Sequence, residues 1–293
     1  MYQFIPLLIV AAVILVAIIV VHVFRYRIAG KGRRSPFTQK MERFSGQGLL
    51  KRLDEVNEEV CIQAASLLGV PMAIYASYVS YLYFDQRQFN LTEAIAAAAM
   101  AAVFMGYTVF KLFGFLNERR RTRLGCEGEM IVGQALNQLM LQGYHVYHDY
   151  PAEGFNIDHI VVGAKGVFAV ATKTRSKRTT ANRREDATVE YDGRALHFPN
   201  GTDIEMIAQA KRQSKWLAGW LSRAVEEELT VRAVLALPGW FVKRTAAQGM
   251  PVVNPKQFDS LFAHIPSRAL TSDMIARITH QLDQKCRTIE PQA

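Results

Sequence analysis

The sequence predicts an α/β domain that is preceded by three transmembrane α-helices. Long apolar runs occupy much of residues 1–118, whereas the chain after them alternates helical and strand-like patterns. Such an alternation favours a mixed sheet flanked by helices. We therefore divide the 293 residues into a membrane region, residues 1–118, and a domain, residues 119–293.

Three runs are predicted to span a membrane. Residues 5–24 contain no Asp, Glu, Lys or Arg, and a helix of about 20 such residues crosses the hydrocarbon core of a bilayer. A cleaved signal peptide is the alternative, but no basic residue precedes this run. Residues 64–84 end in tyrosines that suit a membrane interface. Residues 94–115 are rich in alanine, and a buried soluble helix is their alternative reading.

Basic residues are distributed unevenly around these runs. Nine Lys and Arg residues lie within residues 25–59, and a basic segment follows the third run, whereas the loop between the second and third runs contains only Arg87. The positive-inside rule then places the N-terminus outside, and the loop 25–59 and the domain in the cytosol. The sequence thus predicts a multi-pass protein of the cell inner membrane, with the lipid bilayer as a partner.

The net charge of +9 belongs to both parts of the chain. Residues 1–118 hold 11 basic and 8 acidic residues (+3), and the remainder holds 24 and 18 (+6). A basic cytosolic part is compatible with nucleic acid or with anionic lipid, and charge alone does not choose between them. Three widely spaced cysteines have no metal-ligand spacing and fit reduced thiols.

The domain is predicted to begin with a helix, because apolar residues recur at helical spacing from Met130 to Met140 before Gly143 ends the pattern. Strand-like runs follow at residues 144–150, 156–163 and 167–173. The remaining predicted elements are a strand pair at 188–198 with a tight turn at Asp192 and Gly193, a helix at 203–228, a strand at 231–242, a strand entering a helix at 251–262, and a final helix.

An acid and a lysine are predicted to meet at the end of two of these strands. Alternation places Ala171 and Lys173 on one face of their strand, and the turn at 164–166 would bring Asp158 close to both. Carboxylates hold Mg²⁺, the metal lowers the pKa of a bound water, and a nearby lysine stabilises the attacking hydroxide. The arrangement suits phosphodiester hydrolysis, and a surface Asp and Lys at two strand ends are the alternative reading.

Residues 124–220 resemble the nuclease-related domain family (NERD). The resemblance lies in "GCEGEMIVGQALNQL" and "NIDHIVVGAKGVFAVATK". It implies a restriction-endonuclease-like mixed sheet of the PD-(D/E)XK superfamily, with Mg or Mn as cofactor and DNA as substrate. It further implies that Glu129 and Asp158 bind the metal, that Lys173 is the catalytic lysine, and that Gln209 faces the site from a helix.

One position departs from the family pattern. The family has a glutamate two residues before the catalytic lysine, where this chain has Ala171. Because alanine offers no ligand or charge, affinity for Mg²⁺ should fall. Three acids elsewhere are candidate substitutes for the missing carboxylate: Glu127, Glu153 and Glu190.

Basic residues after Lys173 and on the later helix are predicted to bind nucleic-acid phosphates, which requires positive charge but no base-specific group. A solvated charged loop is the alternative reading. The predicted residues are Arg175, Lys177, Arg178, Arg183, Arg184, Lys211 and Lys215.

Other polar and aromatic residues are interpreted as structural. His159 alternates away from Asp158 and is read as packing or as a support for the site, and His148 as an ordinary strand-edge residue. Asp149 and Glu153 could line the site, and solvated loop acids are the favoured reading of both. Trp216 and Trp220, one helical turn apart, are read as core.

Three hypotheses follow. The first is a membrane-tethered, metal-dependent phosphodiesterase that acts on DNA near the membrane. The second keeps the fold without catalysis, as a module that binds nucleic acid or a partner. The third is a scaffold whose basic segments bind anionic lipid or other membrane proteins.

Overall fold

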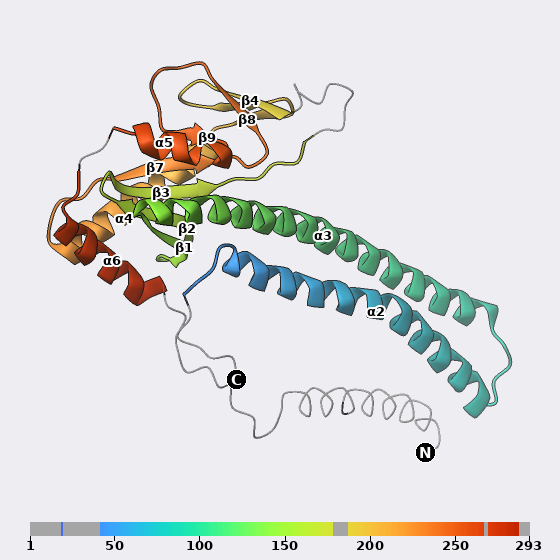
Figure 1. The fold of residues 1–293 in the computed structure, drawn as a ribbon. Coiled ribbons are helices and arrows are strands. Elements are labelled where there is room, and N and C mark those ends of the chain that lie inside the picture. The colour runs from blue at the N-terminus through green and yellow to red at the C-terminus, as the bar shows by residue number, and fades with distance from the viewer. Residues whose placement is uncertain (1–18, 20–41, 178–186, 267–268, 287–293) are drawn as a thin grey trace. The chain divides into compact units, whose positions relative to one another are not determined.

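The computed structural model describes residue 19 and residues 42–177, 187–266 and 269–286 (Figure 1). The predicted span at residues 5–24 lies outside these residues except for position 19, and so do Arg178, Arg183 and Arg184. The described chain forms two compact units, one of residues 54–120 and one of residues 42–53 and 121–286.

The first unit consists of parts of two long helices, α2 (Gln47–Phe84) and α3 (Leu91–Asn137). Asn90 caps the start of α3, since its Oδ1 accepts the backbone N–H of Thr92 at 3.0 Å. The two helices are joined at their other ends, where Arg119 Nε donates to Asn57 Oδ1 at 2.6 Å. The predicted helical hairpin therefore forms.

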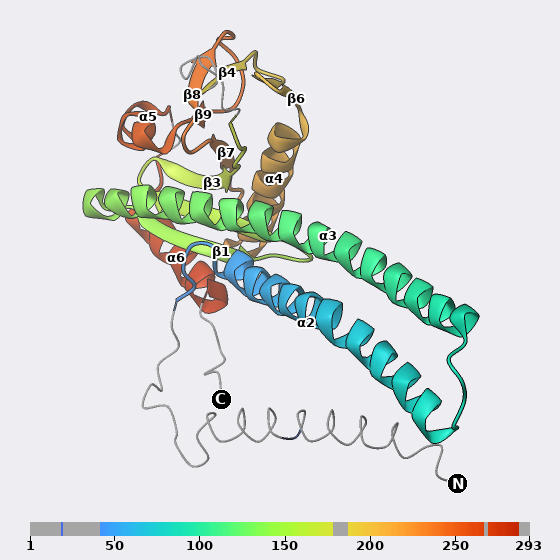
Figure 2. The same cartoon turned by 90° about the vertical axis from the view of Figure 1, so that its right-hand side faces the viewer.

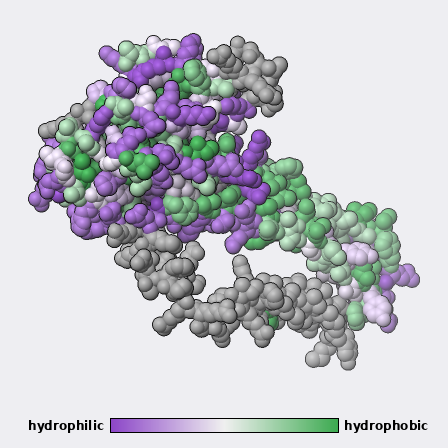
Figure 3. Space-filling view, in the orientation of Figure 1, coloured by the Kyte–Doolittle hydropathy of each residue, from purple (hydrophilic) through white to green (hydrophobic). Residues whose placement is uncertain are grey.

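Two helices of the described chain, Gln47–Phe84 and Leu91–Gln142, are long and apolar enough to cross a membrane. In the most apolar stretch of each helix, the buried share of residues is 0% for the first helix and 6% for the second. These segments are therefore not core helices. Large apolar side chains are exposed along the hairpin, as the green surface of Figure 3 shows. Exposed apolar surface of this extent marks a lipid or protein contact.

The helices extend further than the apolar runs predict. Helix α2 begins at Gln47, so part of the predicted loop 25–59 is helical, and α3 continues without a break past residue 118. The basic residues that end the apolar run are themselves good helix formers. Arg123 and Glu127 form an i,i+4 ion pair at 2.9 Å on this stretch.

The second unit is built on a five-stranded mixed sheet in the order β1-β2-β3-β7-β9. Strands β1, β2 and β3 are antiparallel neighbours, and β7 and β9 continue the sheet in parallel. The strands are β1 (His145–Pro151), β2 (Asn156–Gly163), β3 (Gly166–Thr172), β7 (Val231–Ala236) and β9 (Val252–Val253). The three strands predicted between residues 144 and 173 are confirmed within two residues at each end.

Helices cover both faces of this sheet (Figures 1 and 2). Phe168 and Val170 pack against Val132 and Leu136 of α3, whereas Val167 and Ala169 pack against Leu217 on the other side. The predicted alternation along β3 is therefore confirmed. The covering elements are the end of α3 with η2 (Gln138–Gln142) and α5 (Phe258–His264) on one face, and α4 (Glu205–Val225) and α6 (Ser272–Cys286) on the other.

A second sheet, not expected from the sequence, has the order β6-β5-β4-β8. The prediction of one strand at residues 231–242 is wrong, because Pro238 and Gly239 break it and send the chain from β7 into the second sheet. Gly239 has φ 80°, a conformation that favours glycine. The strands are β4 (Thr188–Tyr191), β5 (Leu196–Phe198), β6 (Gly201–Asp203) and β8 (Phe241–Arg244), and η4 (Pro255–Gln257) links β9 to α5.

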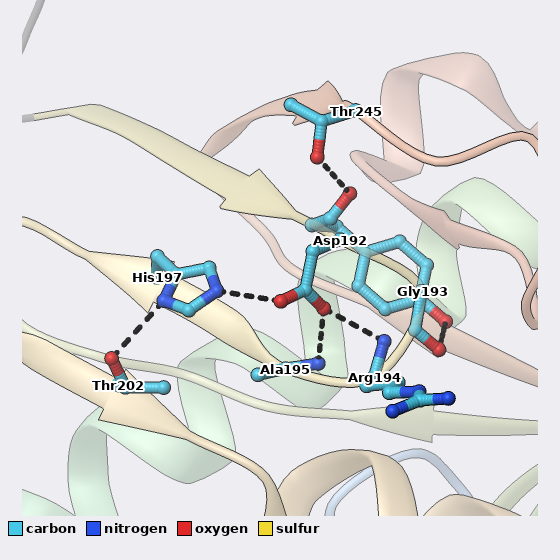
Figure 4. Close-up of polar contacts among 8 residues, drawn as sticks. Asp192, Gly193, Arg194, Ala195, His197, Thr202 and Thr245 are labelled. Carbon is cyan, nitrogen blue, oxygen red and sulfur yellow. Dashed lines mark hydrogen bonds and ion pairs between the residues drawn. The ribbon is translucent and has the colours of Figure 1, made fainter.

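The tight turn between β4 and β5 forms as predicted (Figure 4). Asp192 Oδ1 accepts the backbone N–H groups of Arg194 and Ala195 at 2.8 and 2.6 Å. Its Oδ2 lies 2.9 Å from His197 Nε2. The hydrogen bond with His197 is the main cause of a lowered pKa of Asp192, and the two backbone N–H groups lower it further. The same contacts hold the turn in place.

Candidate acid site

Asp158 stands where β2 meets the end of β3. The pairing of His159 with Val170 places Asp158 opposite Ala171, one step further along the antiparallel ladder. Its Oδ2 accepts the backbone N–H of Thr172 at 2.7 Å. The sequence-based expectation that Asp158 approaches positions 171 and 173 is thus met by the pairing of the strands.

Glu129 reaches the same place from α3. Burial raises the pKa of Glu129, and the negative charges of Asp158 and Asp149 raise it further. The charge of Lys173 opposes this effect. The two carboxyl groups and the ammonium group therefore lie close enough to interact electrostatically.

Lys173 follows directly after β3 and is held by the neighbouring strand. Its backbone N–H donates to the carbonyl of Ala236 at the end of β7, at 3.0 Å. Burial raises the pKa of Asp158, while the Thr172 N–H and the Lys173 charge oppose the rise. Lys173 and the Asp158 carboxyl group thus share this edge of the sheet, where the charge of the lysine acts on the acid.

The glycine of the "GCEGEM" segment permits the approach of α3 to this edge. A Cβ at Gly128 would lie 2.0 Å from Thr174 Cγ2, which is closer than any contact between such atoms. The helix that carries Glu129 can therefore reach the residues that follow Lys173 only because position 128 has no side chain.

Ala171 lies in an apolar cluster and is 2% exposed. Its neighbours there include Val189, Ile207 and Leu235. None of the three candidate substitutes is placed to restore its carboxylate: Glu127 pairs with Arg123, Glu190 pairs with Lys243 at 2.6 Å, and Glu153 is exposed.

Asp149 is a buried acid, although the sequence favoured a solvated position over one that lines the site. It is 4% exposed, and its backbone has φ 48°, which is unusual for a residue other than glycine. Its carboxylate accepts bonds from Arg43, Gly48 and Asn156. The interpretation as a solvated loop acid is wrong, and the signal available was its position inside the strand "YHVYHDY".

The acids present fit a hard divalent cation. Among the described residues no group of three or more His, Cys, Asp and Glu side chains is placed to hold a metal ion. Mg²⁺ keeps several waters, however, and needs only one or two protein carboxylates. Glu129 and Asp158 supply two, beside a lysine whose charge acts on both.

Residues 124–238 match the nuclease-related domain. This segment starts in α3 and ends just after β7, so it contains Glu129, Asp158, Lys173 and Gln209. Searches of curated proteins and of solved structures found no match. The family match agrees with the resemblance in the sequence and extends it by 18 residues beyond position 220.

Two histidines lie beside the candidate acid site. His159 is fully buried, with Nε2 3.1 Å from Thr172 Oγ1 and Nδ1 2.9 Å from His148 Nδ1. His148 Nε2 in turn lies 2.9 Å from Asn137 Oδ1. The reading of His159 as packing or support is confirmed, whereas His148 is not an ordinary edge residue.

Acid is expected to destabilise this histidine pair. Burial lowers the pKa of His148 to about 4, so between that value and the ordinary 6.5 the unfolded chain binds a proton that the folded chain does not. Stability is then lost as the pH falls below 6.5, by about 2 kcal/mol between pH 7 and pH 5 for this group. Unfolding curves of the wild type and His148→Gln at both pH values measure the loss that is due to His148. The other titrating groups are present in both proteins, so their effects cancel in the comparison. Equal losses in the two proteins would contradict the assignment.

The helix glutamine that contacts β2 is Gln213. It is 6% exposed, and its Nε2 donates to the backbone carbonyl of Asn156 at 3.1 Å. Gln209, one turn earlier on α4, is partly buried, and its role in the site stays a prediction. Gln213 was not predicted as a residue of the site.

The first two predicted phosphate-binding residues are held against aromatic rings. The Arg175 guanidinium lies 4.6 Å from the ring of Phe198, and Lys177 Nζ lies 5.6 Å from that of Trp240. Lys211 and Lys215 are exposed on α4. Lys215 lines an open groove of about 510 Å³ with Arg212, Trp216, Gly219 and Arg223.

Proposed function

We propose that the protein is a membrane-tethered phosphodiesterase that depends on a divalent metal and acts on DNA. The proposal rests on the convergence of Glu129, Asp158 and Lys173 at one edge of the main sheet, inside the segment that matches the nuclease-related domain. Two carboxylates and a lysine are the groups that metal-assisted phosphodiester hydrolysis requires.

Each residue has a role in this proposal. Glu129 and Asp158 would hold Mg or Mn, which when bound would supply polarisation of the phosphate and activation of a water. The Thr172 N–H, 2.7 Å from Asp158 Oδ2, orients that carboxylate. Lys173 stabilises negative charge that develops at the phosphate.

The apolar hairpin supports the tether. The proposal keeps the sequence-based topology, with the N-terminus outside and the domain on the cytosolic side of the cell inner membrane. A tether of this kind would confine hydrolysis to DNA near the bilayer. Other membrane proteins are further partners of the hairpin under this proposal, because its apolar side chains are exposed.

The first test is cleavage of labelled single- and double-stranded DNA by the full chain in detergent. Cleavage is expected with Mn²⁺ or Mg²⁺ and is expected to stop on addition of EDTA. Asp158→Asn should lower the rate by roughly a hundredfold or more, since it removes a metal ligand and keeps the shape of the side chain. Equal cleavage by the wild type and this variant would place any observed activity elsewhere.

A binding module without catalysis is the second candidate, because Ala171 removes a family carboxylate and is packed among apolar residues. It predicts binding of DNA that does not depend on metal, with no cleavage by the wild type.

Phosphate contacts of α4 make a separate prediction. The double variant Lys211→Ala/Lys215→Ala is expected to lower the slope of log affinity against log salt by about 2, because each lysine that contacts a phosphate contributes about 1. Fluorescence anisotropy of labelled DNA between 50 and about 200 mM salt measures this slope. The exposed residue Lys51, on α2, provides the matched control as Lys51→Ala. An unchanged slope in the double variant would remove α4 from the interface.

A further inference from the structure

Residues 43–48, which precede the matched segment by more than 70 positions, lie on the acids of the nuclease-related domain. We call these residues the strap. Ser45 Oγ donates to the backbone carbonyl of Glu129 at 2.5 Å, and the Gly46 N–H donates to the Glu129 carboxyl group. The strap therefore holds Glu129 by both its main chain and its side chain.

A second set of contacts runs from the strap towards Asp158. Arg43 Nη2 and the Gly48 N–H donate to Asp149 Oδ2 at 2.6 and 3.1 Å. The other oxygen of Asp149 accepts from Asn156 Nδ2 at 2.7 Å. Asn156 opens β2 two residues before Asp158, so the strap is connected to both acids of the proposed metal site.

The strap fits closely against its neighbours. A Cβ at Gly133 of α3 would lie 2.6 Å from Ser45 Cβ. A Cβ at Gly48 would lie 3.2 Å from Asn156 Nδ2, and Gly46 has φ +80°. Glycine is thus required where α3 meets the strap and where the strap itself turns.

The strap is also anchored beyond the acids. The Arg43 N–H donates to the carbonyl of Cys286 at the end of α6, at 3.0 Å. The side chains of this ion pair are largely buried, with 21% of Arg43 and 6% of Asp149 exposed. A charge-assisted hydrogen bond in such surroundings is strong, and loss of one partner leaves the other charge buried.

We propose that the strap is a positioning element of the acid site and that Arg43 is its principal positioning residue. This inference rests on the proposed function, since it concerns the metal affinity of Glu129 and Asp158. Groups that orient metal ligands typically contribute tenfold to a hundredfold to metal affinity. The matched segment 124–238 is then insufficient for the site, which needs residues from the start of the apolar hairpin.

Titration of the full chain in detergent with Mn²⁺, followed by electron paramagnetic resonance, tests the proposal. Arg43→Ala is expected to weaken the binding of Mn²⁺ by roughly tenfold to a hundredfold, and Arg43→Lys by less, because lysine keeps the charge. Lys51→Ala, which removes an exposed positive charge from the first turns of α2, is expected to bind like the wild type. Equal affinity of Arg43→Ala and the wild type would overturn the proposal.

A double-mutant cycle shows whether Arg43 acts through Asp149. In an Asp149→Asn background, Arg43→Ala should cause little further loss, because the ion pair is already absent. Full additivity of the two effects would overturn this route. Thermal unfolding identifies variants that do not fold, and Ser45→Ala, which removes a single bond to Glu129, then takes the place of Arg43→Ala with an expected severalfold loss.

The outcome also separates this proposal from the proposed function. Binding of Mn²⁺ that Asp158→Asn weakens, with no effect of Arg43→Ala or Ser45→Ala, would reject the strap and leave the metal site. Absence of any binding that depends on Asp158 would reject the metal site, and the strap's role in it would be rejected as well.

Discussion

Lys173→Ala is expected to lower the rate of DNA hydrolysis by roughly a hundredfold to a thousandfold, the effect of removing one group that stabilises developing charge. The lysine lies beside Glu129 and Asp158, and its charge influences the pKa of each. Because its side chain is at the strand end and its backbone bond to Ala236 does not depend on the side chain, the fold should persist.

The rate constant should fall while the affinity for DNA changes little, since one lysine contributes only a small part of phosphate binding. Single-turnover cleavage measures the first quantity and fluorescence anisotropy the second. Lys51→Ala is the matched control, because Lys51 is exposed on α2 and is not among the predicted phosphate-binding residues. A loss of affinity with an unchanged rate constant would assign Lys173 to binding alone.

Ala171→Glu is expected to have two opposite effects. Without metal, the glutamate inserts a carboxyl group into the apolar cluster around Leu235, opposite Asp158. Overpacking and the burial of a charge should cost about 3 kcal/mol or more, which lowers the melting temperature by roughly 10 °C for a unit of this size.

With Mn²⁺ the same glutamate becomes a third carboxylate beside the metal. The variant should then regain stability, and its melting temperature should rise more with added Mn²⁺ than that of the wild type. Ala169→Glu, two residues earlier on the same face of β3 and away from Asp158, is the control that should show only the loss. If Mn²⁺ raises the melting temperature of neither variant, position 171 does not face a metal site.

The sequence predicted the part of the domain in which local pattern and tertiary structure agree. The alternation through "NIDHIVVGAKGVFAVATK" set the bounds of β2 and β3, and the short turn between them set the register that places Asp158 opposite Ala171. Strand alternation and turn length are local properties, so one sequence is enough to read them.

Contacts between distant segments were not predictable in the same way. Nothing in the pattern around Arg43 indicates that it pairs with Asp149, 106 residues later. Asp149 was misread because a buried acid in a strand is rare unless it has a partner, and its partner lies in a different part of the chain. The continuous helix α3 was divided because a change from apolar to basic residues was taken as a boundary, although both kinds favour helix.

The second sheet was missed for a similar reason. Its strands have three or four residues each, and β8 follows β7 after four residues. The sequence of residues 231–242 is therefore typical of one strand. Only the structure shows that the chain passes from one sheet to the other at Pro238 and Gly239. The tight turn at Asp192, in contrast, has a side-chain signature and was predicted.

The central claim is that Glu129 and Asp158 hold one divalent metal beside Lys173. Anomalous diffraction from crystals of the full chain soaked in Mn²⁺ tests it most directly. A single strong peak is expected between the two carboxylates, and no such peak in crystals of Asp158→Asn. A Mn²⁺ peak elsewhere in the domain, with none between these two carboxylates, would contradict the account.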